Sequence, residues 1–269
     1  MKFSLKSLLT IAAAASTLIL AGCGEKAVDN NKVKIGVMAG AEAQVAEVAA
    51  KVAKEKYNLD VELVTFTDYV TPNAALDDGS IDANAFQHKP YLDKQIADRG
   101  YKLAIVGNTF VYPIAGYSKQ IKSVDELQDG ARIAVPNDPT NLGRSLLLLQ
   151  QQGLLKLRED VGLLATVRDI VENPKKLEIL ELDAAQLPRS LDDVALSIIN
   201  TTYASSINLT PEKDGIFVEN KESPYVNILV AREANVNAEN VQNFKKAYQT
   251  DEVAKAASEI FQGGAVQGW

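Results

Sequence analysis

Short apolar runs alternate with longer segments of helical periodicity along the first part of the chain. Residues 33–38 and 61–66 are apolar runs of strand length, and residues 42–56 between them repeat apolar side chains every three or four positions. The first pattern predicts buried strands and the second predicts an amphipathic helix. The alternation continues with a helix starting at 72–76, a strand at 81–86, a helix at 90–99 and a strand at 102–106. Strands separated by crossover helices predict a parallel sheet.

The alternation restarts after a break, which predicts a second unit. The second series has a strand at 131–135, a helix ending near 151, a strand at 177–182, a short helix at 186–191 and a strand at 194–200. A strand at 225–231 and two helices within 237–261 follow, and we expect these helices to pack on the first unit. The fold class is therefore α/β with two lobes, and 269 residues, 46% of them hydrophobic, suffice for two modest cores.

The expected lobes are discontinuous in sequence. Lobe 1 is predicted to comprise residues 33–110 together with about 228–269, and lobe 2 about 111–227. The chain would cross between the lobes within 108–118 and again within 210–227. In open α/β sheets, ligands bind beyond the carboxyl ends of the strands, and with two lobes that position is the cleft between them.

The residues that follow the predicted strands are aromatic side chains, amides and one arginine. They lie in the segments 68–69, 86–88, 137–144 and 200–203. Asn227 adds an amide within the otherwise apolar strand at 225–231. A buried amide needs hydrogen-bond partners, and the ammonium group of a ligand would be a suitable one. Together these residue types favour a small zwitterionic ligand.

Arg144 stands out because it lies close to the start of a predicted helix, which opens at Asp138 or Thr140. The first turn of a helix usually carries acids, since the helix dipole is positive there. One interpretation is a solvated arginine, or one paired with Asp138. The other is that the missing anion arrives with a ligand, because free N–H groups and a guanidinium together bind carboxylates. On the second interpretation the empty cleft holds an unpaired positive charge.

The N-terminus has the pattern of a secretory signal peptide. Two lysines precede an apolar run at 8–21, which is short and rich in alanine, and the sequence Leu-Ala-Gly-Cys ends at Cys23. This ending resembles a bacterial lipobox, which implies removal of residues 1–22 and acylation of Cys23. The alternative is an ordinary signal peptide with a chance cysteine. Residues 23–32 are mostly small or polar, which predicts a tether between the lipid and the domain.

Composition narrows the possible partners. Removing residues 1–22 takes away two lysines and no acids, so the formal net charge goes from −7 to −9. An acidic surface argues against nucleic acid or anionic lipid as a partner. Cys23 is the only cysteine, so the chain has no pair of cysteines to form an internal disulfide.

The patterns of common enzymes are missing. His88 is the only histidine, whereas a catalytic zinc site usually needs several. Neither a Gly-x-Ser-x-Gly motif nor a phosphate-binding Gly-x-x-x-x-Gly-Lys motif occurs. The adjacent acids at 77–78 and 192–193 are interpreted as solvated turns. We therefore expect no catalytic residues, no metal and no cofactor.

Six segments, in order along the chain, carry a resemblance to a known family. They are 86–92, 106–110, 136–144, 186–189, 199–204 and 223–227. The chain resembles the methionine-binding lipoproteins of ABC importers, and the resemblance extends from the lipobox to residues 263–269. It implies a periplasmic-binding-protein fold of the Venus-flytrap type (type II), with methionine held between the lobes. It also implies a membrane permease and its ATPase as partners, and a protein anchored by lipid to a bacterial membrane, facing the periplasm or the cell exterior.

The resemblance also implies a role for each pocket residue. Arg144 would hold the carboxylate, helped by Asn141, and Asn200 and Asn227 would bind the polar end of the amino acid. The thioether would be walled by four aromatic rings, those of Tyr69, Phe86, His88 and Tyr91. One departure from the family pattern is a short link at 192–196, which bears on the register of the strand before Asn200.

Other interpretations stay open at this point. Phe86 and Tyr91 are also ordinary core residues, and His88 could be a helix-start residue without a ligand role. The same fold could bind a methionine-containing dipeptide or another apolar amino acid. A lipoprotein that acts by surface interaction, without transport, is the alternative from another class.

Overall fold

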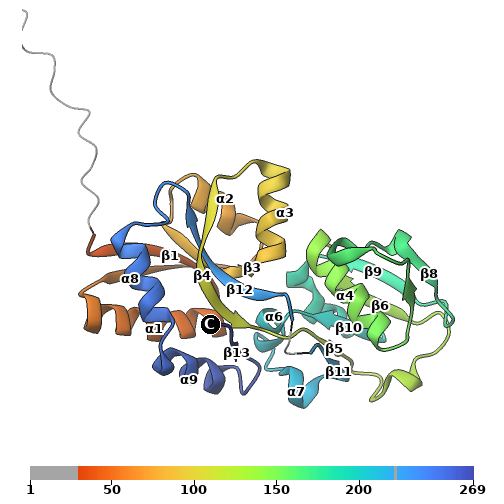
Figure 1. The fold of residues 1–269 in the computed structure, drawn as a ribbon. Coiled ribbons are helices and arrows are strands. Elements are labelled where there is room, and N and C mark those ends of the chain that lie inside the picture. Colours follow the sequence, from red (N-terminus) through yellow and green to blue (C-terminus); the bar gives the residue numbers. More distant parts are fainter. Residues whose placement is uncertain (1–29, 221–222) are drawn as a thin grey trace, which may run out of the picture.

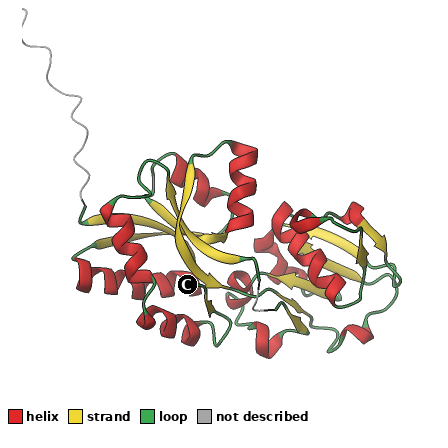
Figure 2. Ribbon diagram, in the orientation of Figure 1, coloured by secondary structure: helices red, strands yellow, loops and turns green. Residues whose placement is uncertain are grey.

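The structure is a computed structural model that describes residues 30–220 and 223–269. The predicted signal peptide, Cys23 and the tether up to residue 29 lie outside the described residues. Two sheets with their helices lie side by side (Figures 1 and 2). The two-sheet α/β class expected from the sequence is confirmed.

The larger sheet has six strands in the order β13-β4-β12-β3-β1-β2. Its strands are β1 (Lys32–Met38), β2 (Asp60–Phe66), β3 (Ala83–His88), β4 (Leu103–Val111), β12 (Val226–Arg232) and β13 (Val266–Gln267). β1 runs parallel to β2 and β3, whereas β12 is antiparallel to both β3 and β4. The predicted parallel sheet therefore has an antiparallel strand inserted by the returning chain.

Helices cover both faces of the six-stranded sheet (Figure 1). They are α1 (Ala41–Tyr57), α2 (Thr71–Asp77), α3 (Lys89–Arg99), α8 (Glu239–Tyr248) and α9 (Asp251–Ile260). α1 packs with α8 and α9 over a core that includes Val45 and Phe244. Leu76 of α2 and Leu92 of α3 pack on the other face, against Ile228. The expected packing of the C-terminal helices on the first unit is confirmed.

The smaller sheet has five strands in the order β11-β5-β10-β6-β9. They are β5 (Ala115–Tyr117), β6 (Arg132–Pro136), β9 (Glu178–Leu182), β10 (Leu196–Ile199) and β11 (Phe217–Val218). Around it lie α4 (Pro139–Gln151), α5 (Leu187–Ser190), α6 (Thr201–Ser205) and α7 (Pro211–Asp214), with a separate pair of short strands, β7 (Lys156–Leu157) and β8 (Ile170–Glu172). Gly143 of α4 lies so close to a neighbouring turn that an added Cβ would come within 2.2 Å of the Leu163 carbonyl oxygen.

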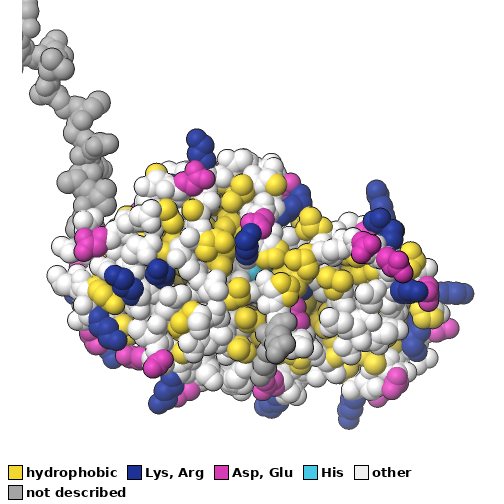
Figure 3. Space-filling view, viewed as in Figure 1, with side chains coloured by type: hydrophobic (Ala, Val, Ile, Leu, Met, Phe, Trp, Pro, Cys, Tyr) yellow, Lys and Arg dark blue, Asp and Glu magenta, His cyan; other side chains and the backbone are white. Residues whose placement is uncertain are grey.

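The chain passes between the sheets in the segment that joins β4 to β5 and again in the segment that joins β11 to β12. Both segments lie within the ranges expected for the crossings. A third apolar cluster contains Met38 and Phe86 from the larger unit with Leu187 and Tyr203 from the smaller one. On the face in Figure 3, charged side chains of both signs surround hydrophobic atoms that gather where the units meet.

Several boundaries differ from the sequence expectation. β3 begins at Ala83 and continues to His88, because its last residues pair with Ile228 and Asn227 of β12. β4 continues to Val111 because both β12 and β13 pair with it there. The short strands β5, β7, β8, β11 and β13 and the short helices α6 and α7 were not predicted, since two to five residues are too few for a periodic pattern.

Candidate functional site

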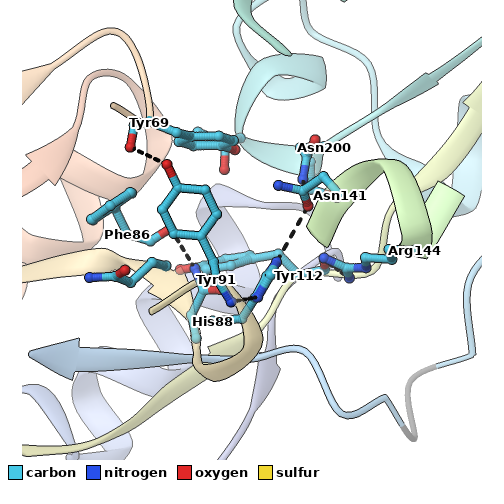
Figure 4. A pocket seen from close by; sticks show the side chains of 12 residues that line it. Tyr69, Phe86, His88, Tyr91, Tyr112, Asn141, Arg144 and Asn200 are labelled. Carbon is cyan, nitrogen blue, oxygen red and sulfur yellow. Dashed lines mark hydrogen bonds between the residues drawn. The ribbon is translucent and has the colours of Figure 1, made fainter. Parts of the chain in front are cut away.

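A pocket between the two sheets contains all eight side chains that the sequence analysis assigns to the ligand (Figure 4). Its lining consists of Tyr69, Phe86, Gln87, His88, Tyr91, Tyr112, Asn141, Arg144, Asn200, Thr201, Thr202 and Asn227. Most lie at or just beyond the carboxyl ends of strands β2, β3, β4, β6 and β10, as the strand-end rule predicts, whereas Tyr91 lies on α3 and Asn227 on β12. Gln87, Thr201 and Thr202 belong to segments already singled out, whereas Tyr112 lies in a crossing and had no sequence signal.

One wall of the pocket is aromatic. The rings of Tyr69, Phe86 and Tyr91 lie with centroids 6.0 to 6.4 Å apart, and the Tyr91 hydroxyl donates to the Tyr69 carbonyl oxygen at 2.6 Å. Tyr203 of α6 packs on Tyr69 from the other unit, at 5.0 Å between centroids. Edge and tilted ring contacts of this kind are favourable, and the wall suits a soft thioether.

Behind this wall, three buried amides form a closed hydrogen-bonded cluster. Asn73 of α2 donates to Gln87 at 2.8 Å, and Asn84 and Gln87 both donate to the Asn73 oxygen, at 2.9 and 2.6 Å. The Gln87 nitrogen also donates to Asn84 at 3.0 Å. Buried amides that satisfy one another in this way fix α2 against β3 and leave the aromatic wall well supported.

His88 both starts α3 and faces the pocket. Its Nδ1 accepts from the backbone N–H of Tyr91 at 3.1 Å, as a helix cap, and its Nε2 lies 3.4 Å from Oδ1 of Asn141. Burial, and next the neighbouring Arg144, lower the pKa of His88 to about 3. The ring is therefore neutral at physiological pH, with its hydrogen on Nε2. His88 is therefore a helix-start residue that also lines the pocket, and its contact with a ligand stays a prediction.

Arg144 is buried and is already paired. Its Nε donates to Oε1 of Glu219 at 2.8 Å, its Nη2 donates to the other carboxylate oxygen, and Nη2 also donates to the Tyr112 carbonyl at 3.0 Å. The ring of Tyr225 lies 4.4 Å from the guanidinium carbon. The expectation of an unpaired charge in the empty cleft is therefore wrong. Pairing with Asp138 is also wrong, because Glu219, 75 positions away, supplies the acid.

The Arg144 guanidinium keeps one nitrogen for a ligand. Nη1 donates no hydrogen bond to any residue in the described ranges. The side chains of Arg144 and Glu219 are only 3% and 10% exposed, so water reaches the pair poorly. A guanidinium held in a bidentate fork by one carboxylate still presents donors on its free edge.

The amides of the site have different partners. Asn141 donates from Nδ2 to Asp138 at 2.8 Å, and its Oδ1 accepts from Nδ2 of Asn200 at 3.0 Å. Oδ1 of Asn200 is buried and has no hydrogen-bond partner among the described residues. Asn227 donates to the Phe86 carbonyl at 3.2 Å, so the backbone of β3 satisfies part of this amide without a ligand. β10 pairs with β5 and β6 despite the short link before it.

Two further contacts join the units at the pocket. Thr202 of α6 donates to the Glu42 carboxyl in the first turn of α1, and the Tyr203 hydroxyl donates to the Thr67 carbonyl at 3.3 Å. Burial raises the pKa of Glu42 from its ordinary value of 4.5 to about 8. Glu42 had no distinctive sequence signal, because an acid in a first helical turn is common. Within residues 30–220 and 223–269, no group of three or more His, Cys, Asp or Glu side chains could hold a metal ion.

A family model and a curated relative match this chain along most or all of its length. The model is that of the NlpA lipoprotein family, and it matches residues 33–269. The D-methionine-binding lipoprotein MetQ of Escherichia coli strain K12 is 68% identical over 271 residues, which cover 100% of each chain. The relative carries the name of a binding protein, which agrees with the expectation that the chain is not an enzyme.

Solved structures show the same fold. A crystal structure of the methionine-binding protein MetQ is 72% identical, with a TM-score of 0.89, and the match covers 90% of this chain and 99% of that one. A nutrient-binding protein from Burkholderia cenocepacia, bound to methionine, is 50% identical with a TM-score of 0.86, over 88% and 100% of the chains. An ABC-transporter periplasmic substrate-binding protein from Coxiella burnetii is 49% identical with a TM-score of 0.86, over 88% and 100%.

Proposed function

The chain belongs to the NlpA lipoprotein family, and we propose that it captures methionine between its two sheets and delivers it to the permease and ATPase of an ABC importer. Relatives at high identity over nearly the whole chain carry methionine in their names, and one was solved with methionine bound. The two sheets are the cores of the two lobes, which are divided where the chain crosses between them.

The observation that carries the proposal is a buried pocket with a donor and an acceptor that no described residue satisfies, beside an aromatic wall. Nη1 of Arg144 is the donor and would bind the ligand's carboxylate, next to Asn141. Oδ1 of Asn200 is the acceptor and would receive the ammonium group, with Asn227 nearby. An α-amino acid carries these two groups on the same carbon, and a zwitterion therefore matches the pocket better than a simple cation or anion.

The aromatic half sets the side-chain preference. Tyr69, Phe86 and Tyr91 enclose an apolar space next to the neutral His88. A thioether gains from contact with aromatic rings and needs no hydrogen bond there. An uncharged ring at His88 also fits an uncharged side chain.

The N-terminal part of the proposal concerns the anchor. Acylated Cys23 would hold the domain at a bacterial membrane, facing the periplasm or the cell exterior. Within the described ranges, no helix is both long and apolar enough to cross a membrane. Two or more acyl chains on one cysteine are sufficient for stable anchoring.

Calorimetric titration of the mature domain tests the proposal. The panel is L-methionine, D-methionine, glycyl-methionine, leucine and methioninol, which lacks the carboxylate. We expect methionine to bind one to one, and methioninol and leucine to bind at least about tenfold more weakly. Tighter binding of glycyl-methionine or leucine would mean that this compound, and not methionine, is the transported ligand. No binding by any amino acid or dipeptide would favour a lipoprotein that works by surface interaction.

A further inference from the structure

Asp138 does not line the pocket, but it determines how a pocket amide is oriented. Its side chain caps α4: Oδ1 accepts from the backbone N–H of Asn141 at 3.0 Å and from the Thr140 hydroxyl at 2.9 Å. Oδ2 accepts from Nδ2 of Asn141 at 2.8 Å. A carboxylate has acceptors only. The NH₂ group of Asn141 must therefore face Asp138, and its oxygen must face the opposite way, towards the pocket.

His88 imposes the same orientation from the other side. Because Nδ1 accepts from the backbone N–H of Tyr91, Nε2 must carry the ring hydrogen. That N–H faces Oδ1 of Asn141 at 3.4 Å (Figure 4). A reversed Asn141 amide would set acceptor against acceptor at Asp138 and donor against donor at His88. Two neighbours on different elements thus require the same arrangement.

Asn141 in turn determines the orientation of the Asn200 amide. Its Nδ2 donates to the Asn141 oxygen at 3.0 Å, which leaves its own Oδ1 buried without a partner among the described residues. Asn200 is also the N-cap residue of α6, where an asparagine oxygen commonly accepts from the first turn, yet its side chain makes no capping hydrogen bond. This acceptor is therefore free for a ligand N–H group.

We propose that Asp138 is a positioning residue for the ligand, which acts through Asn141 to keep Asn200 presenting an oxygen and not an NH₂ group to the pocket. This inference rests on the proposed function, since it assigns the free oxygen to the ammonium group of the amino acid. It makes the pocket selective for ligands that carry an N–H donor at that point. An Asn200 amide turned the other way would oppose the ammonium group with its own hydrogens.

The first test is Asp138→Asn. Asparagine is as good an N-cap as aspartate, so the start of α4 is kept. Its NH₂ group, however, takes the place of Oδ2 and opposes the NH₂ group of Asn141. We expect methionine affinity to fall about tenfold to hundredfold, as for a disrupted buried hydrogen bond. The melting temperature of the ligand-free protein should change by no more than about 2 °C.

A ligand without the amino group separates this effect from a general disturbance. 4-(Methylthio)butanoic acid has the carboxylate and thioether of methionine but no ammonium group. Asp138→Asn should leave its affinity within about threefold of wild type, while methionine loses about tenfold or more. Equal losses for both compounds would mean that Asp138 only supports the local structure, and the proposal would be wrong.

Asp183→Asn is the matched control. Asp183 is also a partly buried N-cap aspartate, whose side chain accepts from the backbone N–H of Ala185. The structure shows no hydrogen bond from it to Asn141 or Asn200. Its replacement should leave methionine affinity within about threefold of wild type. A loss as large as that in Asp138→Asn would mean that removing any nearby negative charge weakens binding. It would contradict the relay, by which Asp138 orients Asn141 and Asn141 orients Asn200.

The relay further predicts coupling between two residues that do not touch. In an Asn200→Asp background, the substituted side chain has acceptor oxygens in either orientation, and a reversed Asn141 amide would donate to it. Asp138→Asn should then no longer weaken methionine binding. If Asp138→Asn causes the same fold loss with and without Asn200→Asp, the two residues act independently, which overturns the proposal.

A ligand-free measurement keeps this inference separate from the proposed function. In nuclear magnetic resonance spectra of the side-chain amides, Asp138→Asn should shift the NH₂ signals of both Asn141 and Asn200, and Asp183→Asn should shift neither. If wild type fails to bind methionine, the proposed function fails, while these shifts still decide the relay. If wild type binds methionine but the Asn200 signal does not move in Asp138→Asn, the relay is wrong.

Discussion

Removing the Glu219 carboxylate tests whether Arg144 binds the ligand. In Glu219→Ala the guanidinium stays buried, with the Tyr112 carbonyl and the Tyr225 ring as its remaining contacts. Breaking a buried ion pair from one side costs about 3–5 kcal/mol, because a buried charge is left uncompensated. In a chain of this size each kcal/mol lowers the melting temperature by about 2–4 °C. The ligand-free variant should therefore melt roughly 10 °C below wild type.

Methionine should repair part of this loss if its carboxylate contacts Arg144. Saturation at about a thousand times the dissociation constant stabilises wild type by about 4 kcal/mol. In Glu219→Ala the ligand also supplies the missing negative charge, so its affinity should rise by about tenfold or more. The difference in melting temperature between variant and wild type should then narrow by about a third or more at saturating methionine.

The assay is calorimetric melting of both proteins, empty, with methionine and with methioninol. Methioninol lacks the carboxylate and should not narrow the difference. Glu172→Ala is the control, because Glu172 forms an exposed ion pair with Lys156 and its loss should cost about 1 kcal/mol or less. Equal narrowing with methionine and methioninol, or none with either, would show that Arg144 is a structural partner of Glu219 and does not hold the carboxylate.

Three further predictions each concern one residue. Asn227→Ala removes the hydrogen bond to the Phe86 carbonyl, which contributes about 1 kcal/mol to stability, so the ligand-free protein should melt a few degrees lower. The variant should also bind methionine more weakly in calorimetry. Unchanged affinity would mean that Asn227 does not contact the ligand. The pKa of Glu42 is raised to about 8, so the folded protein holds a proton that the unfolded chain releases above pH 4.5, and this contribution to stability is lost as pH rises from 4.5 to 8. Glu42→Gln should reduce this loss of stability, measured by denaturant titration at about pH 5 and 8. An unchanged pH dependence would contradict the raised pKa. Cys23→Ala should abolish lipid attachment in mass spectra, while the domain without residues 1–22 binds methionine as wild type does; lost binding would give the anchor a second role.

Periodicity and the strand-end rule were sufficient for the main elements and for the place of the pocket. Phe86 and Asn200 could be singled out because each lies at the carboxyl end of a recognisable apolar strand. The order of strands in the larger sheet could not be predicted, because β12 inserts antiparallel between β3 and β4 only after more than a hundred residues have followed β4. Pairing between strands so distant in sequence leaves no local pattern.

The partners of the pocket residues could not be predicted from the sequence. Glu219 lies in a crossing segment without periodicity, and only the fold brings it to Arg144. The helix dipole correctly indicated that Arg144 needs a negative partner near the start of α4. It did not indicate that Glu219 of the same chain supplies that partner. Thr202 lies in a recognisable segment, yet its contact with Glu42 depends on how the two units meet.

The two units contact each other directly, both within the pocket and beside it. His88 and Asn141 face each other within the pocket, whereas the Tyr203 hydroxyl reaches the Thr67 carbonyl on its aromatic side. The measured affinity of a binding protein is its intrinsic affinity multiplied by the fraction of molecules in the binding-competent arrangement. Contacts such as that of Tyr203 stabilise the arrangement in which the two units enclose the pocket. We therefore expect affinity to depend both on groups such as Arg144, which we propose contact the amino acid, and on contacts that hold the units together around it.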